Sequence, residues 1–241
     1  MKVKAIKTEI FRERENLPGF IFKYVKNIKE NSILVVTSKI VALAEGRTAV
    51  FKNKKQKEEL IKKESDFAIP AKIAWLTIKE GRLLANAGID ESNAAGMLIL
   101  LPKNSRKSAE DLRKKIMQKF RLKNFGVLVC DSGLLPLRAG AVGISIGYAG
   151  FRGVTSHVGK KDLFGRELKM SKTDVADSLA AAAVLTMGEG GERQPLCMIT
   201  EAPVVFTNKV QKGELNMDMK KDIYAPLLKG FKNLVQGNSG A

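Results

Sequence analysis

The sequence is poor in histidine, cysteine and aromatic residues, and each shortage excludes a class of protein. The single histidine, His157 in "TSHVG", offers too little context for a zinc site built on histidine pairs or for Ser-His-Asp hydrolysis, so we expect a loop residue. Cys130 and Cys197 lie in apolar runs, which indicates buried, reduced thiols in a cytoplasmic protein, although a lone Cys-His couple stays open. Aromatic residues make up 6% of the chain and are not interleaved with its basic runs, which argues against single-stranded nucleic acid binding.

Long apolar segments are also missing. Residues 1–11, "MKVKAIKTEIF", are charged throughout and lack the apolar core of a signal peptide. The most apolar helix candidate, residues 175–188, is too short and too polar at its ends to span a bilayer. We therefore expect a cytoplasmic protein without a membrane segment.

Positive charge is what the chain has in excess. It contains 42 Lys and Arg against 25 Asp and Glu, a net charge of +17, and the lysines are spread over the whole sequence. Such a field attracts nucleic acids, nucleotides or polycarboxylate substrates. A scattered mixture of lysine and glutamate is also the usual composition of solvated helix faces. Charge alone therefore fits both a nucleic-acid-binding protein and an enzyme with anionic substrates.

The apolar pattern predicts several strands in a chain of 241 residues, which is long enough for one large domain or two closely packed ones. Residues 33–36 predict a buried strand whose end presents the hydroxyls of Thr37 and Ser38. Residues 125–130 predict another buried strand, which stops abruptly at Asp131. Further strands are expected around the turn at residues 80–81, at residues 140–150, where glycines indicate close backbone packing, and at residues 196–200.

Helical periodicity predicts three helices, at residues 55–67, 107–120 and 171–187. The first has the lysine and glutamate spacing of a solvated helix. The second is amphipathic, and Ser108 with Asp111 resembles a capping box at its start. The third is apolar and buried, with a cap expected near Ser171 or Thr173 and a stop at Gly188.

Three acids follow apolar segments and stand among small residues: Asp90 in "NAGIDESN", Asp131 in "VLVCDSG" and Glu189 in "TMGEGGE". Carboxylates suit Mg²⁺ or Mn²⁺, which proteins often hold together with nucleotide phosphates. Glycines around Glu189 would let backbone amides approach phosphate oxygens. Taken singly, an Asp after a strand is more often a turn former or helix cap, and spacing does not show that the three acids converge. The phosphate-loop and dinucleotide motifs are absent.

Six ordered blocks carry a family resemblance: "VVTSKIVALAEGR", "NAGIDESN", "GVLVCDS", "VGISIGYAG", "KDLFGREL" and "AAAVLTMGEGGE". Together they resemble the coenzyme F420:L-glutamate ligase family over residues 2–199. The resemblance implies an enzyme that joins the amine of L-glutamate to a carboxylate acceptor, using GTP and divalent metal. It also implies an α+β fold of mixed, largely antiparallel sheets with packed helices, in an intertwined homodimer. Residues 1–205 would form the catalytic unit, with two interleaved subdomains as an option, and residues 206–241 a C-terminal extension.

The resemblance also assigns site residues. Asp90 and Asp131 match the ligands of a first metal, and Ser132 and Glu189 those of a second, with Mg²⁺ or Mn²⁺ as the metal and K⁺ as an optional further ion. The three acids and Arg138 form the expected catalytic set. The residues that match nucleotide contacts are Thr37, Ser38, Asn93, Met187, Gly188, Gly190, Gly191 and Gln194, with residues 8–11 as a further stretch. Arg138, Lys160 and Arg166 are candidates for holding the anionic acceptor and glutamate.

The chain departs from the family pattern on the acceptor side. The usual D-[ST]-x-G-R is "DSGLLPLRAG" here, so Arg138 stands alone further along, and Leu43 occupies the place of a nucleotide-contact lysine. The D-x-x-G before "KDLFGR" is "SHVG". "TSKIVALAEGR" and "DIYAPLL" look more like a bacterial branch labelled putative folate-metabolism γ-glutamate ligase. The sequence therefore leaves folate and the F420 precursor open as acceptors, and GTP and ATP as nucleotides.

The expected partners are L-glutamate, one of these anionic acceptors and a second copy of the chain, without a membrane or nucleic acid. The alternative is a non-catalytic, basic nucleic-acid-binding protein on the same scaffold. That alternative requires DNA or RNA affinity whose logarithm falls linearly with the logarithm of salt concentration. We expect the protein not to be retained on a nucleic-acid column at moderate salt. Retention that weakens steeply as salt rises would instead support the alternative.

Overall fold

The computed structural model describes residues 1–218 and 220–228, so part of the expected C-terminal extension lies outside the described residues. The chain forms two compact units. The first unit comprises Met1–Arg47 and Leu101–Glu214, and the second comprises Thr48–Leu100 with the residues that follow Glu214. The predicted division at residue 205 stays a prediction.

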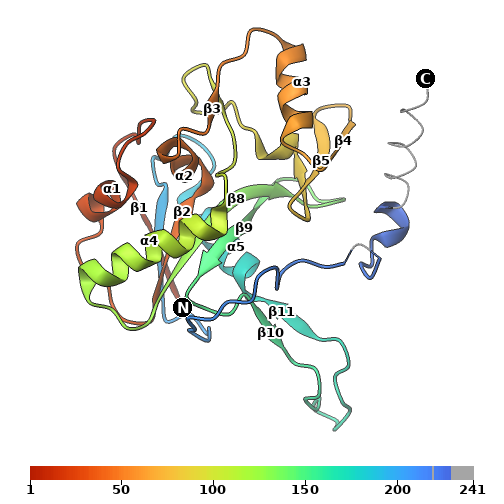
Figure 1. Ribbon diagram of the computed structural model, residues 1–241. Helices are drawn as coiled ribbons and strands as arrows, with labels where there is room; N and C mark the ends of the chain where they lie inside the picture. The colour runs from red at the N-terminus through yellow and green to blue at the C-terminus, as the bar shows by residue number, and fades with distance from the viewer. Residues whose placement is uncertain (219, 229–241) are drawn as a thin grey trace. The chain divides into compact units, whose positions relative to one another are not determined.

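The first unit is built on a five-stranded sheet (Figure 1). Its strands, in spatial order, are β1 (Lys2–Ile6), β12 (Leu196–Thr200), β2 (Ser32–Thr37), β8 (Phe125–Leu134) and β9 (Ala141–Ala149). β2 and β8 run parallel, whereas the other neighbours are antiparallel. The apolar run of β2 is completely buried, since Ile33, Leu34, Val35 and Val36 are each 0% exposed. The α+β fold with a mixed, largely antiparallel sheet is thus confirmed.

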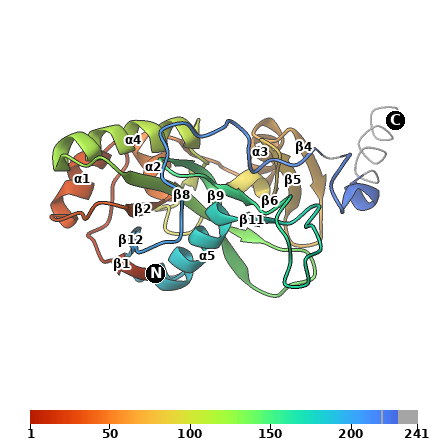
Figure 2. The same cartoon turned by 90° about the horizontal axis from the view of Figure 1, so that it is seen from below.

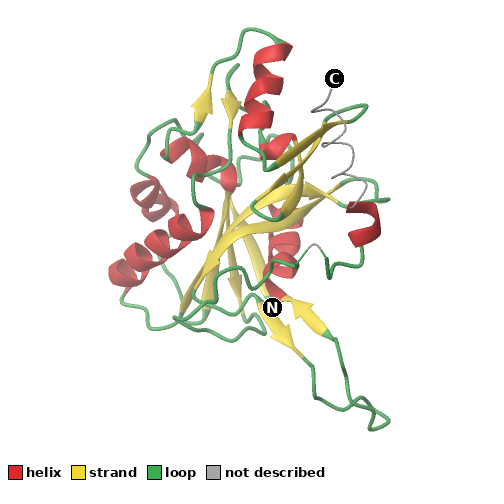
Figure 3. Ribbon diagram, turned by 45° about the vertical axis from the view of Figure 1, so that its right-hand side comes forward, coloured by secondary structure: helices red, strands yellow, loops and turns green. Residues whose placement is uncertain are grey.

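Helices cover both faces of this sheet. α1 (Leu17–Tyr24), α2 (Ser38–Ala44) and α4 (Ser105–Phe120) lie on one face, and α5 (Val175–Met187) lies on the other (Figure 2). α4 buries Ala109, Leu112 and Ile116, which confirms the amphipathic face expected from the sequence. The first unit also contains a short hairpin of β10 (Val154–Ser156) and β11 (Lys172–Asp174). Beyond these strands, residues 157–171 extend as an arm (Figure 3).

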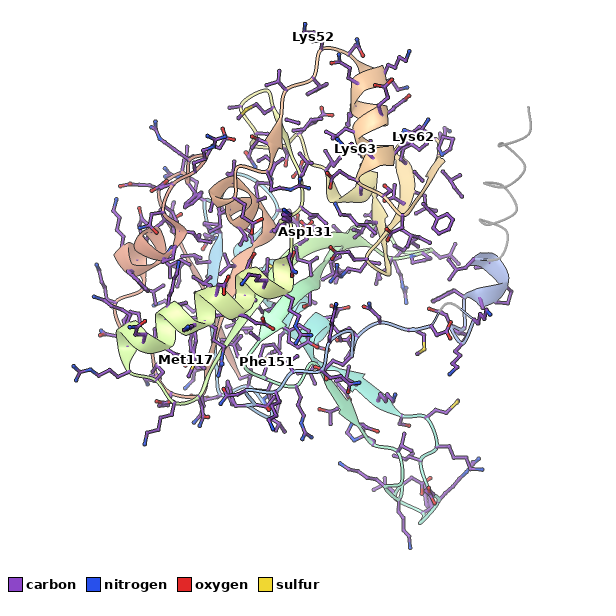
Figure 4. All side chains as sticks on the ribbon, in the orientation of Figure 1. Lys52, Lys62, Lys63, Met117, Asp131 and Phe151 are labelled. Atoms are coloured by element: carbon purple, nitrogen blue, oxygen red, sulfur yellow. The ribbon has the colours of Figure 1, made fainter. Side chains whose placement is uncertain are left out.

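The second unit contains a three-stranded antiparallel sheet. Its strands are β4 (Phe67–Pro70), β5 (Trp75–Lys79) and β6 (Arg82–Ala85), and a separate pair joins β3 (Thr48–Ala49) to β7 (Leu98–Ile99). Helix α3 (Lys54–Lys63) buries Ile61 in a core with Ala87, Ile89, Leu98 and Leu100. Figure 4 shows Lys62 and Lys63 on this helix, and the ammonium of Lys62 lies 4.9 Å from the ring centre of Trp75. The predicted solvated helix and the hairpin around residues 80–81 are both confirmed.

β8 does not stop at Asp131, as the sequence suggested, but continues to Leu134. The pairing with β9 extends past the apolar run, because Asp131 lies opposite Ile144 and Ser132 lies opposite Gly143. Polar residues at the end of an apolar run resemble a strand end, yet an antiparallel partner can keep the strand extended well beyond it.

A β-bulge lets β9 pack against two helices. Val129 pairs with Gly147 but Cys130 pairs with Ser145, so Ile146 is an extra residue on β9. After the bulge, the side chains of β9 that would have pointed to one face of the sheet point to the other. A Cβ at Gly143 would lie 2.3 Å from the Ala180 oxygen of α5, and one at Gly147 would lie 2.4 Å from the carbonyl carbon of Ser105 in α4. The close backbone packing expected from the glycines is therefore confirmed.

The cap predicted for α4 is wrong, and the cap of α5 lies one residue after Thr173, close to where it was predicted. α4 begins earlier, because the side chain of Asn104 accepts the Lys107 N–H at 2.9 Å, while the Ser108 hydroxyl donates to Glu45. α5 is capped by Asp174, whose carboxylate accepts the Asp177 N–H at 2.9 Å. Its expected stop at Gly188 is confirmed, with φ +83° at that residue. No helix within the described residues is long and apolar enough to cross a membrane.

The contact at Gly147 gives a test of the α4–β9 packing. We expect Gly147→Ala to lower the free energy of unfolding by about 2 kcal/mol or more, because the methyl group would meet α4 backbone rather than a movable side chain. Urea unfolding measures the change. Gly191→Ala is the matched control, since a Cβ there has nothing within 4 Å. Equal stability of the two variants would contradict the described packing.

Candidate functional site

One edge of the sheet in the first unit gathers most of the expected site residues. Because β2 and β8 are parallel, their carboxyl ends lie side by side, with Thr37 opposite Cys130. Ser38, which begins α2, and Asp131 come directly after this pair. β12 starts at the same edge, and the Thr37 N–H donates to the Pro195 oxygen at 3.0 Å.

Ser132 connects Asp131 and Glu189, the two predicted metal-ligating acids that lie in the first unit. Its hydroxyl lies 2.8 Å from both carboxylate oxygens of Glu189, and its N–H donates to Asp131 Oδ1 at 2.9 Å. Asp131, shown on β8 in Figure 4, is half-buried, whereas Ser132 and Glu189 are exposed. The fold thus brings together two acids that are far apart in the sequence. We call Asp131, Ser132 and Glu189 the acidic cluster.

The acidic cluster has the chemistry of a site for a hard divalent cation. It offers two carboxylates and a hydroxyl, all oxygen donors, and Mg²⁺ commonly takes one or two carboxylates while keeping water or phosphate as further ligands. Within the described part of the chain, no group of three or more histidine, cysteine, aspartate or glutamate side chains is placed to hold a metal. The two carboxylates and the hydroxyl of the cluster would leave further positions on such a cation for water or phosphate oxygens.

The glycine loop, residues 188–195, contains Glu189 of the acidic cluster and is fixed at both ends. The Gly188 N–H donates to Val184 at the end of α5, and the Gln194 side chain donates to the Met187 oxygen at 3.2 Å. The Thr8 N–H donates to the Arg193 oxygen at 2.9 Å, which places the expected stretch 8–11 beside this loop. The described structure thus groups most of the predicted nucleotide-contact residues at one edge.

Glu192 lies in the loop of residues 187–194 that the sequence matched to nucleotide contacts, but the sequence assigned it no role of its own. Its carboxylate turns back and accepts the Gly190 N–H at 2.8 Å. Gly191, in contrast, faces open space, since a Cβ there would have nothing within 4 Å. The sequence signal available was a second acid directly after paired glycines, but nothing in the sequence indicates where that side chain points.

Asp90 and Asn93 belong to the second unit and lie three residues apart in one turn. The backbone of Asp90 exchanges two hydrogen bonds with Ile99, and its carboxylate accepts both the N–H and the hydroxyl of Ser92. Asn93 is exposed and has φ +55°, in the left-handed region. Glu91, which follows Asp90, is exposed and forms an ion pair with Lys57.

The candidate acceptor-binding residues lie on exposed loops. Arg138 sits in the turn between β8 and β9, and its N–H donates to the Leu135 oxygen at 3.3 Å. Lys160 and Arg166 lie on the arm, where the Arg166 N–H donates to Asp162. Their hydrogen bonds stabilise their own loops, so a role in substrate binding rests on the sequence.

The cysteine beside the cluster is not an activated nucleophile. Burial raises the pKa of the Cys130 thiol, and the neighbouring charge of Asp131 raises it further. Cys130 and Cys197 are free and buried, as expected. His157 lies in a loop, where its Nε2 is 3.0 Å from the hydroxyl of Thr173, so the structure gives the Cys-His couple no support.

Known proteins resemble this chain over most of its length. A model of the F420-0:Gamma-glutamyl ligase family matches residues 5–201. A coenzyme F420:L-glutamate ligase of Methanococcus maripaludis is 45% identical over 146 residues, which are 61% of this chain and 58% of that relative. A protein of the same name from another strain is 33% identical over 230 residues, 88% of this chain and 91% of the relative. One from Methanocaldococcus jannaschii is 34% identical over 234 residues, 86% and 90% of the two chains.

Proposed function

The chain belongs to the F420-0:gamma-glutamyl ligase family, and on that premise we propose that it is a nucleotide-dependent ligase that adds L-glutamate to a carboxylate acceptor. The observation that carries the proposal is the acidic cluster beside the glycine loop. Oxygen donors for a divalent cation and backbone amides for phosphate lie at the same edge of one sheet. Phosphoryl transfer needs both.

The reaction proceeds in two steps in this proposal. A carboxylate is a poor electrophile, so the γ-phosphate of GTP or ATP is first transferred to the acceptor carboxylate, giving an acyl phosphate and a nucleoside diphosphate. The amine of L-glutamate then attacks the acyl carbon, and inorganic phosphate leaves. The amide bond therefore forms at the expense of one phosphoanhydride bond. The amine attacks through its nitrogen lone pair, so it must be in its deprotonated form.

Each group of residues has a distinct task. Asp131, Ser132 and Glu189 would hold Mg²⁺ or Mn²⁺, which would neutralise charge on the transferred phosphoryl group. The amides of the glycine loop would bind phosphate oxygens, with Thr37 and Ser38 beside them. The sequence motif alone assigns Asp90 a metal-ligand role and Asn93 a nucleotide contact. Arg138, Lys160 and Arg166 remain candidates for the substrate carboxylates.

Acceptor and assembly complete the proposal. The relatives' names support the F420 precursor, and the branch motifs "TSKIVALAEGR" and "DIYAPLL" support folate. We propose a homodimer because Leu163 and Phe164 on the arm are 98% and 95% exposed, and exposed apolar residues of this kind mark contact surfaces. K⁺ is an optional further ion, and we place the enzyme in the cytoplasm.

The deciding experiment is incubation with GTP or ATP, Mg²⁺ or Mn²⁺, L-glutamate and a panel of acceptors, read by mass. We expect one acceptor to gain a glutamyl unit, with equimolar release of phosphate. Folate and the F420 precursor are the first two acceptors to compare. No glutamyl product with either acceptor under any nucleotide and metal combination would contradict the proposed function.

Substitutions in the acidic cluster test the site itself. We expect Asp131→Asn and Glu189→Gln each to reduce turnover about 100-fold or more, because each removes a negatively charged ligand from the phosphoryl-transfer site. Circular dichroism and urea unfolding check that both variants stay folded. The control is Glu110→Gln, which removes an acid that pairs with Arg106 on the surface of α4. Wild-type turnover in both cluster variants would show that the site is misassigned.

A further inference from the structure

The carboxylate of Glu192, the second acid of the glycine loop, lies against the backbone of two of the loop's glycines. Glu189 accepts the hydroxyl of Ser132, whereas Glu192 accepts the Gly190 N–H. A Cβ at Gly188 would lie 2.6 Å from the Glu192 carboxyl carbon, and one at Gly190 would lie 3.3 Å from its Oε1. The Glu192 carboxylate therefore fills the space that the missing side chains of two glycines leave open.

This placement is not explained by stabilisation of the neighbouring helix. Gly188 is the C-cap of α5, and the carboxyl end of a helix carries partial negative charge from its unsatisfied carbonyl groups. A carboxylate against that end is electrostatically unfavourable. What holds Glu192 there is the N–H of Gly190, a backbone donor in a glycine-rich turn, which is the kind of group that binds anions in proteins.

We propose that Glu192 is an internal substitute for a phosphate oxygen of the nucleotide. In the nucleotide-free protein its carboxylate accepts the Gly190 N–H, and the triphosphate displaces it on binding. A carboxylate oxygen and a phosphate oxygen would both accept the same N–H of Gly190, so only one of the two anions can bind there at a time. This inference rests on the proposed nucleotide-dependent function and adds a residue that competes with the nucleotide.

The loop around Glu192 permits this exchange without refolding. Its backbone is fixed by the hydrogen bonds from Thr8 to Arg193, from Thr37 to Pro195 and from Gln194 to Met187. Glu192 itself is exposed, so rotation about its side-chain bonds moves the carboxylate into water. The loop backbone then keeps its conformation while the anion that accepts the Gly190 N–H changes.

The consequence is a lower apparent affinity for nucleotide. When Glu192 occupies the site for part of the time, the apparent dissociation constant for nucleotide equals the intrinsic one divided by the fraction of molecules in which the site is free. Removing the charge of Glu192 weakens its hold on Gly190 and lifts that penalty. We expect Glu192→Gln and Glu192→Ala to bind GTP or ATP roughly threefold to tenfold more tightly than wild type.

Titration calorimetry of the full chain in Mg²⁺ tests this, with GTP, ATP and inorganic triphosphate as probes. Glu167→Gln is the matched control, because it makes the same charge change on the exposed arm. Tighter binding by both Glu192 variants, with no such gain in the control, is the expected result. The Michaelis constant for nucleotide should fall in parallel, and urea unfolding should show stability close to wild type.

Two results overturn the inference, and they are distinguishable. If wild type binds the probes but the Glu192 variants bind equally or more weakly, Glu192 is not a competing anion and the proposed function is unaffected. If wild type binds neither nucleotide nor inorganic triphosphate, nucleotide dependence fails and this inference fails with it.

Discussion

The parallel pairing of β2 with β8 is the constraint on which the rest of the first unit depends. It sets the carboxyl ends of two buried strands side by side, so the polar residues that follow them share one edge. β12 lies antiparallel on the other side of β2 and therefore brings the glycine loop to the same edge. Three segments distant in sequence, around residues 37–38, 131–132 and 189–195, meet because β2 is hydrogen-bonded to β8 on one side and to β12 on the other.

Much of this architecture could be predicted from the sequence. The apolar run at residues 33–36 predicted the buried strand that β2 forms, and the spacing of Ala109, Leu112 and Ile116 predicted one helix face. Local signals were less reliable at element ends. Ser108 fits a capping box as written, but the side chain of Asn104, four residues earlier, accepts the N–H of Lys107 in the first turn of the helix. β8 continues past Asp131 because a partner strand, unseen in local sequence, keeps it extended.

The site was predictable to the extent that its residues occur in recognisable blocks. The link between Ser132 and Glu189 follows from tertiary pairing, and spacing alone left it undecided. Glu192 shows the limit more clearly, since its meaning depends on the direction of one side chain within its own loop. In the sequence, a second acid beside paired glycines is equally consistent with a solvated surface charge and with a side chain bound to the loop backbone. Only the hydrogen bond to Gly190 distinguishes these two interpretations.

The bulge in β9 ties the two faces of the sheet together. Since Ile146 shifts the alternation of the strand by one position, Gly143 faces α5 whereas Gly147, four residues later, faces α4. Deleting that single residue would rotate half of the strand, turning a bare backbone surface away from one helix and a side chain toward it. The length of β9 is thus as constrained as its composition, and insertions or deletions there should be far rarer among functional variants than conservative substitutions.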